Sequence, residues 1–124
     1  MGASSATFHE AAESLSAEVK DRHRAIVSIM EELEAIDWYD QRVEGATDAE
    51  LAGILAHNRD EEKEHAAMTL EWLRRRDPKL DEALRTYLFK EGSVLDIEHA
   101  AESGAGGGPA GDGSLGIGSL RGRS

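Results

Sequence analysis

A Glu-x-x-His pair, Glu62 and His65, lies in a long run of helix-forming residues and is the feature that most constrains this chain. Residues three apart on a helix are neighbours, so the carboxylate and the imidazole share one face. The residues of that face recur in alternating steps of four and three: Leu51, Leu55, Asn58, Glu62, His65, Thr69 and Trp72. This spacing predicts a buried seam of a packed helix, with two polar side chains where leucine would be expected.

A buried carboxylate at Glu62 is costly unless it is paired, hydrogen-bonded or bound to a metal. For a single Glu-x-x-His, a hydrogen-bonded Glu–His or Glu–Arg pair is the simpler interpretation. A metal site becomes the better interpretation only if further ligands lie at the same level of the fold.

The length and composition of the chain exclude several classes of protein. The 124 residues suffice for one small domain, and 14 basic against 25 acidic residues give a net charge of −11, which argues against nucleic-acid binding. The chain has no cysteine, so disulfides and thiolate metal sites are excluded. We find no apolar run long enough for a membrane span and no signal-peptide core near Met1, so we expect a cytoplasmic protein.

Glycine divides the chain. Of 13 glycines, 9 fall between Ser103 and Ser124, whereas the part before them is rich in Ala, Glu, Leu and Arg. We therefore expect a helical domain over residues 1–102, a flexible Gly-rich linker over 103–113 and a terminal peptide over 114–124.

The first expected helix runs from a Thr7–Glu10 capping box to about Val43, and at about 1.5 Å per residue it would be roughly 50 Å long. So long a helix in so short a chain suggests packing against a partner chain. Gly45 is expected to end it in a left-handed conformation.

A second capping box, Thr47–Glu50, opens the next helix, which runs to about Arg76 before Asp77-Pro78 stops it. Two short helices, 79–90 and about 93–102, follow. The predicted fold class is all-α: a long antiparallel two-helix hairpin plus short C-terminal helices, forming a four-helix bundle by dimerisation.

Glu32 lies level with Glu62, because both are fifteen residues from the turn centre near Thr47. Glu32, Glu62 and His65 thus converge as candidate ligands. A di-iron carboxylate centre uses a lone Glu from two helices and a Glu-x-x-His from two others. This chain supplies half of that set, and a two-fold homodimer would supply the rest. Carboxylates with imidazole suit iron, manganese or zinc.

Two further groups accompany these ligands. Tyr39, one heptad beyond Glu32, could hydrogen-bond that carboxylate, or be an ordinary core tyrosine. Glu31, Glu34 and Trp38 share another face, where they form either a point at which cations enter or a solvated acidic face.

His57, Glu61 and Glu64 share one helix face and offer an outer metal site, although a solvated face is the simpler interpretation. The remaining histidines have no partner constellation and are interpreted as structural or exposed; they are His9, His23 and His99.

Three segments, Arg22–Arg42 (RHRAIVSIMEELEAIDWYDQR), Asn58–Arg75 (NRDEEKEHAAMTLEWLRR) and Arg85–Phe89 (RTYLF), resemble the encapsulated ferritins, half-length ferritin-like proteins packaged inside encapsulin shells. The resemblance covers about residues 8–102. It implies a ferroxidase that oxidises Fe²⁺ to Fe³⁺ at a di-iron centre between two chains, and assembly of dimers into a ring-shaped homodecamer.

By this resemblance, the ligands of the centre are Glu32, Glu62 and His65, with Tyr39 nearby. The acids at which iron enters match Glu31 and Glu34, beside Trp38. A peripheral site matches His57, Glu61 and Glu64.

After the linker, Leu115, Ile117 and Leu120 stand among small residues and resemble the cargo-loading peptide of encapsulin guests. A short apolar motif on a flexible tether is suited to docking on a partner, here the encapsulin shell protein. The resemblance therefore places the protein in the cytoplasm, inside an encapsulin nanocompartment.

The leading hypothesis is thus a ferroxidase that supplies iron for storage inside an encapsulin shell. The alternative is a non-enzymatic, metal-stapled helical dimer that acts as an encapsulin-binding adaptor. A third interpretation, a di-iron oxidase or peroxidase with another substrate, has no supporting pocket signature in the sequence.

Overall fold

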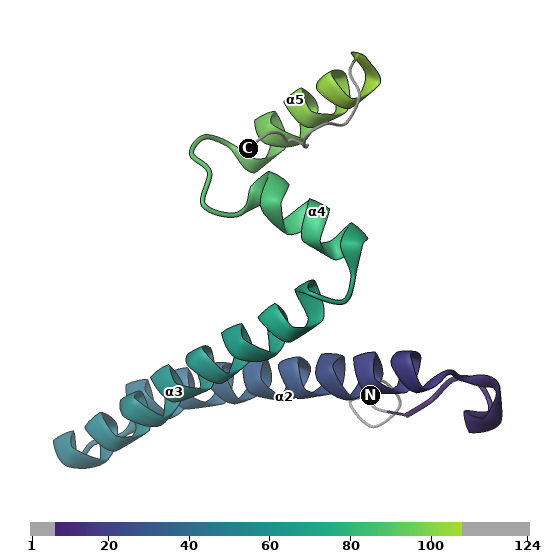
Figure 1. Ribbon diagram of the computed structural model, residues 1–124. Coiled ribbons are helices and arrows are strands. Elements are labelled where there is room, and N and C mark those ends of the chain that lie inside the picture. Colours follow the sequence, from purple (N-terminus) through teal and green to yellow (C-terminus); the bar gives the residue numbers. More distant parts are fainter. Residues whose placement is uncertain (1–6, 108–124) are drawn as a thin grey trace. The chain divides into compact units, whose positions relative to one another are not determined.

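The structure, a computed structural model, describes residues 7–107, and all regular secondary structure in that range is helical (Figure 1). A short 3-10 helix, η1 (Ala12–Ser14), precedes four α-helices. These are α2 (Ala17–Gly45), α3 (Ala49–Arg74), α4 (Pro78–Tyr87) and α5 (Val94–Gly107). The predicted all-α class, a long hairpin followed by short C-terminal helices, is confirmed.

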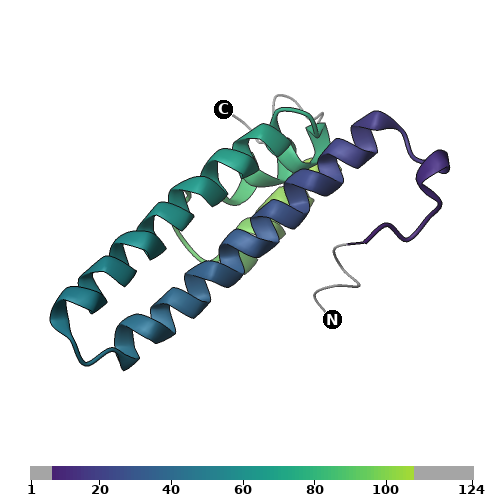
Figure 2. The same cartoon turned by 90° about the horizontal axis from the view of Figure 1, so that it is seen from below.

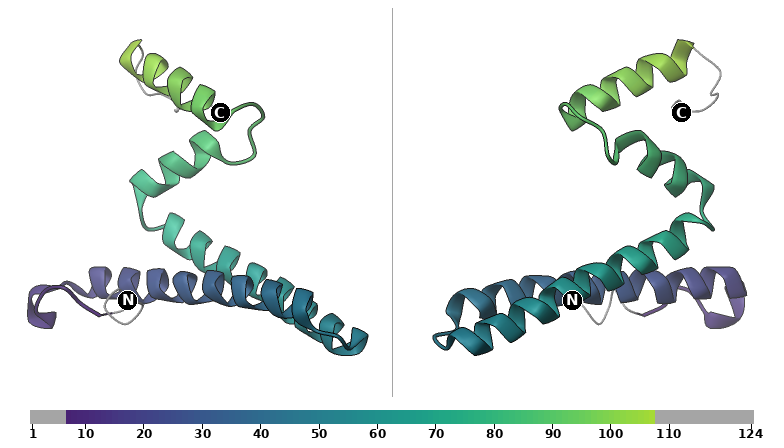
Figure 3. Two further views of the ribbon diagram at one scale, coloured as in Figure 1. Left: turned by 180° about the vertical axis from the view of Figure 1, so that it is seen from behind. Right: turned by 60° about the vertical axis from the view of Figure 1, so that its left-hand side comes forward.

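The chain divides into two compact units, Met1–Leu73 and Arg74–Ser124. The first contains the hairpin of α2 and α3, which lie side by side and antiparallel (Figures 2 and 3). A short connection, Ala46–Asp48, joins them. Among residues 7–107, every helix is too short or too polar to cross a lipid bilayer.

The hairpin begins later than the sequence suggested. No helix begins at Thr7. Instead α2 begins at Ala17, where the Ser16 hydroxyl accepts a hydrogen bond from the Val19 amide at 3.1 Å and caps the helix. The segment before it turns back, and the ring of Phe8 packs edge-on against His23 with centroids 4.8 Å apart. This contact between distant residues competes with extension of the helix.

The turn also differs in its capping residues. Asp48, not Thr47, caps α3: its Oδ2 accepts a hydrogen bond from the Leu51 amide at 2.8 Å. Gly45 is the last helical residue and has no positive φ, so the left-handed cap expected there is wrong. The chain leaves α2 through an extended Ala46, whose amide still donates to the Arg42 carbonyl.

Little of the hairpin is fully buried. Ala25 and Leu73 are the only buried hydrophobic residues that the structure describes. Large apolar side chains on both long helices are exposed in the single chain; they are Val19, Ile26, Met30, Leu33, Leu51, Ile54 and Met68. These exposed apolar side chains agree with the inference from helix length that the hairpin packs against another chain.

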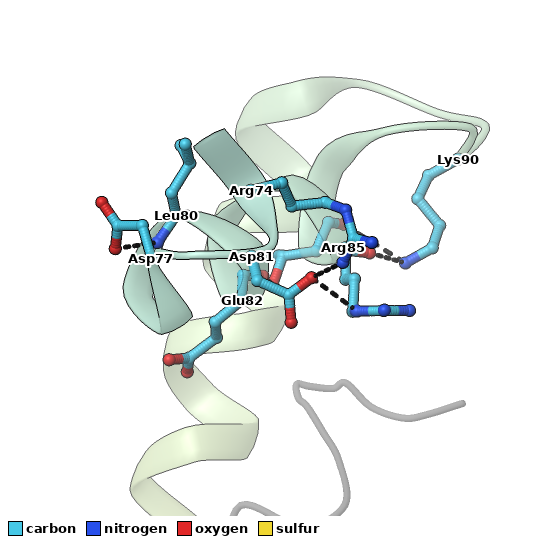
Figure 4. A network of polar contacts seen from close by, with 8 residues as sticks. Arg74, Asp77, Leu80, Asp81, Glu82, Arg85 and Lys90 are labelled. Carbon is cyan, nitrogen blue, oxygen red and sulfur yellow. Dashed lines mark hydrogen bonds and ion pairs between the residues drawn. The ribbon is translucent and has the colours of Figure 1, made fainter. Parts of the chain in front are cut away.

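The second unit is held by polar contacts around α4 (Figure 4). Asp77 caps α4 by accepting from the Leu80 amide at 3.0 Å, and Pro78 opens the helix, so the predicted stop at Asp77-Pro78 is confirmed. The Asp81 carboxylate accepts hydrogen bonds from both Arg74 and Arg85.

After α4, the Lys90 ammonium donates to the Arg85 carbonyl at 2.8 Å. The chain then turns through Phe89 and Gly92, with φ of 61° and 93°. Helix α5 continues to Gly107, five residues beyond the expected end at Glu102. The rest of the predicted linker and the terminal peptide with Leu115, Ile117 and Leu120 lie outside the described residues.

Candidate metal centre

Glu62 and His65 stand on one face of α3, as their spacing predicts. The distance from Glu62 Oε1 to His65 Nδ1 is 3.8 Å, which is ion-pair range but too long for a hydrogen bond. The side chain of Glu62 is 28% exposed and that of His65 is 49% exposed. The imidazole is therefore available for a further contact.

Glu32, in the middle of α2, reaches the same place. Burial raises the pKa of its carboxyl group, and the negative charge of Glu62 raises it further. His65 acts in the opposite direction, and Glu31 adds a smaller increase. Glu32 thus lies within electrostatic reach of both Glu62 and His65, so the fold brings together the three side chains that the antiparallel register predicts.

Glu32 is also incompletely satisfied. Its Oε1 atom is buried and has no hydrogen-bond partner. A buried acceptor without a partner costs roughly 1–3 kcal/mol. The hydrogen bond considered for Tyr39 does not reach this oxygen, although Tyr39 is half-buried on the same helix. Within the single chain, this carboxylate oxygen therefore remains without a hydrogen-bond donor.

The single chain does not complete a metal site. Within residues 7–107, no group of three or more His, Cys, Asp or Glu side chains is arranged to hold a metal ion. Glu32, Glu62 and His65 are near one another but do not by themselves converge on one point.

The proposed cation-entry residues lie on the exposed surface of α2. Glu31 and Glu34 are exposed, and Trp38 is 48% exposed. The sequence analysis did not foresee that Arg42 covers both aromatic rings: its guanidinium carbon is 5.9 Å from the Trp38 ring centroid and 5.4 Å from that of Tyr39. Arg42 follows Trp38 by four residues and Tyr39 by three, and this helical spacing could have predicted both contacts.

The proposed peripheral site contains one close pair. His57 Nε2 lies 3.4 Å from Glu61 Oε2, and these side chains are 70% and 55% exposed. Glu64 is also exposed. Such an arrangement is what a solvated helix face presents, and it contains no buried donor.

An ion-pair network that the sequence analysis missed links the two long helices. Arg59 Nη1 donates to Asp40 Oδ1 on α2 at 3.1 Å, and its Nε donates to Asp60 Oδ1 at 3.1 Å. Lys63 lies 3.4 Å from the same Asp60 oxygen. The hydrogen bond from Arg59 lowers the pKa of Asp60 below its ordinary value. The sequence did contain a signal for this network: Arg59 is a basic residue beside a run of acidic residues, on a helix expected to pack against another helix.

Comparison with known proteins gives close relatives. A protein of Rhodospirillum rubrum called "Encapsulated ferritin-like protein" is 64% identical over 132 aligned residues, which cover 100% of this chain and 94% of that protein. A "Ferritin-like protein" of Thermotoga maritima is 50% identical over 98 residues, covering 79% of this chain and 86% of the relative.

A solved structure is also similar to this chain. The crystal structure of a Nitrosomonas europaea protein superposes with a TM-score of 0.68 at 57% identity, covering 70% of this chain and 96% of that one. The profile of the EncFtn-like family matches residues 7–91, which include all of the α2–α3 hairpin and its candidate ligands. The chain therefore belongs to the EncFtn-like family, that of the encapsulated ferritin-like proteins.

Proposed function

We propose that this protein is a ferroxidase, which binds Fe²⁺ as its substrate and oxidises it to Fe³⁺ with O₂ as electron acceptor. The observation that carries the proposal is the buried, unpartnered Oε1 of Glu32 beside Glu62 and His65. Two carboxylates and an imidazole form a donor set that suits iron. The buried oxygen without a partner supports the proposal, because a bound cation would satisfy it.

A second copy of the chain would complete the centre. The three donors of one chain form half of a di-iron carboxylate set, and a two-fold axis would bring the same half from the partner. The exposed apolar residues of α2 and α3 support such a dimer, since a single hairpin leaves them in water. Further assembly of dimers into a ring-shaped homodecamer is part of the proposal and follows from the family resemblance.

In this centre each side chain has a distinct task. Glu32 and Glu62 would bind the cation as carboxylates, and the charge of bound iron would relieve the repulsion between them. His65 must be neutral to bind through a ring nitrogen. Iron supplies the redox chemistry, because each Fe²⁺ gives up one electron. Tyr39 is placed to shape the site from α2.

The names of the relatives support a location for this activity. A 64% identical relative is described as encapsulated, and both relatives are described as ferritin-like. We infer that this protein is likewise cargo of an encapsulin nanocompartment in the cytoplasm and supplies ferric iron for storage there. The terminal peptide, with Leu115, Ile117 and Leu120, would dock on the shell protein.

The alternative function is a metal-stapled dimer that serves only as an encapsulin-binding adaptor. The exposed apolar surface and the terminal peptide fit this equally well. The unpartnered Glu32 oxygen supports metal binding in both functions, because a metal staple would use the same carboxylate. Oxygen consumption is therefore the property that separates the ferroxidase from the adaptor.

Anaerobic Fe²⁺ loading followed by addition of oxygen separates the two functions. A ferroxidase consumes oxygen in proportion to the iron bound, with particle mass followed before and after. An adaptor binds metal and changes mass without consuming oxygen above the rate of free Fe²⁺. That second result would reject the ferroxidase.

A further inference from the structure

The network around Arg59 has no part in the proposed chemistry, yet it is the described ion-pair network that joins α2 to α3. Arg59 donates from Nη1 to Asp40 on α2 and from Nε to Asp60 on its own helix, both at 3.1 Å. The side chain of Arg59 is only 23% exposed, whereas that of Asp40 is 55% exposed. The side chain of Arg59 therefore bridges the two helices and is less exposed than the carboxylate to which it donates.

The position of the network along the hairpin is informative. Arg59 precedes Glu62 by three residues, so it lies about 4.5 Å nearer the turn on α3. Asp40 follows Glu32 by eight residues, about 12 Å nearer the turn on α2. The buried residues Ala25 and Leu73 lie on the other side of the candidate centre, towards the open end. The centre is thus flanked by an apolar anchor and an ionic one.

The candidate centre brings like charges close together. Glu32 and Glu62 stand on opposite helices, and the negative charge of Glu62 disfavours that of Glu32. None of the residues at their level is fully buried, so apolar packing there is thin. Something must hold α2 and α3 at a fixed separation and register if the carboxylates are to present their oxygens to one cation.

We propose that Arg59, by joining Asp40 of α2 to α3, is a positioning residue that holds Glu32 in register with Glu62 and His65. This inference rests on the proposed metal centre. The planar fork of arginine suits the task because it can donate to two carboxylates in fixed directions, which lysine cannot. Arg59 touches neither substrate nor ligands and acts only through the helix separation.

Co²⁺ is the probe for the test, since its visible absorption reports both affinity and coordination geometry. Full-length protein is titrated with Co²⁺ under nitrogen. Arg59→Gln and Asp40→Asn should each weaken Co²⁺ binding about tenfold, the scale known for residues that orient metal ligands. The double variant should lose no more than either single variant, because both remove the same contact.

Two further variants and one spectroscopic measurement test whether the effect is specific to the contact between Arg59 and Asp40. Arg24→Gln removes an equal charge from an ion pair within α2, with Asp21 at 2.6 Å, and should bind Co²⁺ like the unmodified protein. Arg59→Lys keeps the charge but loses the fork, and should recover only part of the affinity. In Arg59→Gln the Co²⁺ bands should shift or weaken at saturation, which a general loss of stability would not produce.

The outcomes distinguish this inference from the function on which it rests. If Glu62→Gln abolishes Co²⁺ binding while Arg59→Gln and Asp40→Asn bind normally with unchanged bands, the positioning role is wrong and the centre stands. An effect of Arg24→Gln equal to that of Arg59→Gln would also reject it, by pointing to net charge. If Glu62→Gln binds Co²⁺ normally, the centre and the positioning role both fail.

Discussion

Glu62 and His65 lie one turn apart on α3, with 3.8 Å between Oε1 of the carboxylate and Nδ1 of the imidazole. At this distance neither side chain satisfies the other by a hydrogen bond. Both side chains can therefore bind a third group. Glu32 brings a further carboxylate from α2 to the same level, with one oxygen unpartnered.

The first prediction concerns these donors. Glu32→Ala, Glu62→Ala and His65→Ala should each reduce Fe²⁺ oxidation by more than the roughly 10–100-fold that loss of a ligand-orienting partner costs. Oxygen consumption under Fe²⁺ measures this directly. His99→Ala, an exposed histidine on α5, is the matched control and should be near normal. Near-normal oxidation in all three ligand variants would contradict the assignment.

The second prediction concerns the stability of the metal-free protein. The folded state raises the pKa of Glu32, so it binds that proton more tightly than the unfolded chain does. Stability should therefore fall as pH rises from the ordinary glutamate pKa through the raised one. Glu32→Gln removes the charge and should raise the free energy of unfolding at neutral pH by about 1 kcal/mol.

Urea unfolding in the presence of a chelator measures this gain at several pH values. The gain should vanish in acid, where Glu32 itself becomes protonated. Glu34→Gln, an exposed glutamate on the same helix, should show little gain. A Glu32→Gln protein that is less stable at neutral pH would mean that the carboxylate is satisfied within the metal-free protein.

Much of the hairpin could be predicted from the sequence, because the spacing of Leu55, Glu62 and Trp72 on α3 and the position of the turn indicate which helix faces meet. The level of Glu32 follows from the same register. The electrostatic coupling of Glu32 to Glu62 and His65 agrees with that prediction.

The features that were predicted wrongly or missed depend on side-chain contacts that the spacing of residues in the sequence does not determine. The start of α2 moved from Thr7 to Ala17 because Phe8 packs on His23, a contact between residues far apart in the sequence. Asp48 displaced the neighbouring Thr47 as cap, a choice between two adequate acceptors. The link from Arg59 to Asp40 needs a particular side-chain conformation, which a helical pattern cannot specify.

The third prediction links metal to assembly. In the proposed centre each chain would carry part of the donor set, so a bound cation that bridges two chains would stabilise the dimer by mass action. Without metal, carboxylates from both chains oppose closure. Adding Fe²⁺ or Co²⁺ anaerobically should raise the mass measured by analytical ultracentrifugation, and a chelator should reverse this. If the particle mass changes with neither the metal nor the chelator, apolar contacts alone stabilise the assembly and this prediction is wrong.

The fourth prediction concerns cation delivery. Glu31 and Glu34 are exposed on α2 near Trp38 and would raise the local concentration of cations near the centre. Replacing both by alanine should slow Fe²⁺ oxidation at low ionic strength, and the difference should shrink as salt screens the charges. The Co²⁺ affinity of the centre should be unchanged.

A variant with Glu10 and Glu18 replaced by alanine loses the same charge elsewhere and is the control for this effect. Equal slowing in the control would attribute it to the net charge of −11 and not to a local site. An unchanged rate in the Glu31/Glu34 variant at every salt concentration would make these residues part of a solvated face.

The last prediction concerns the terminal peptide, which lies outside the described residues. Leu115, Ile117 and Leu120 are the large apolar residues after Ile97, and burying each on a shell would contribute roughly 1.5–3 kcal/mol. Ordering about eight residues offsets much of this gain. A single peptide should therefore bind weakly, while an oligomer that presents several peptides binds one shell tightly.

Deleting residues 114–124 should abolish packaging in a co-expressed encapsulin shell and leave Fe²⁺ oxidation by the free protein nearly unchanged. Replacing Leu115, Ile117 and Leu120 together by serine should do the same without shortening the chain. Co-purification with shells and oxygen consumption measure the two effects separately. Because the apolar side chains carry the contact, a full-length peptide with three serines that still packages would show that the shell recognises another part of the molecule.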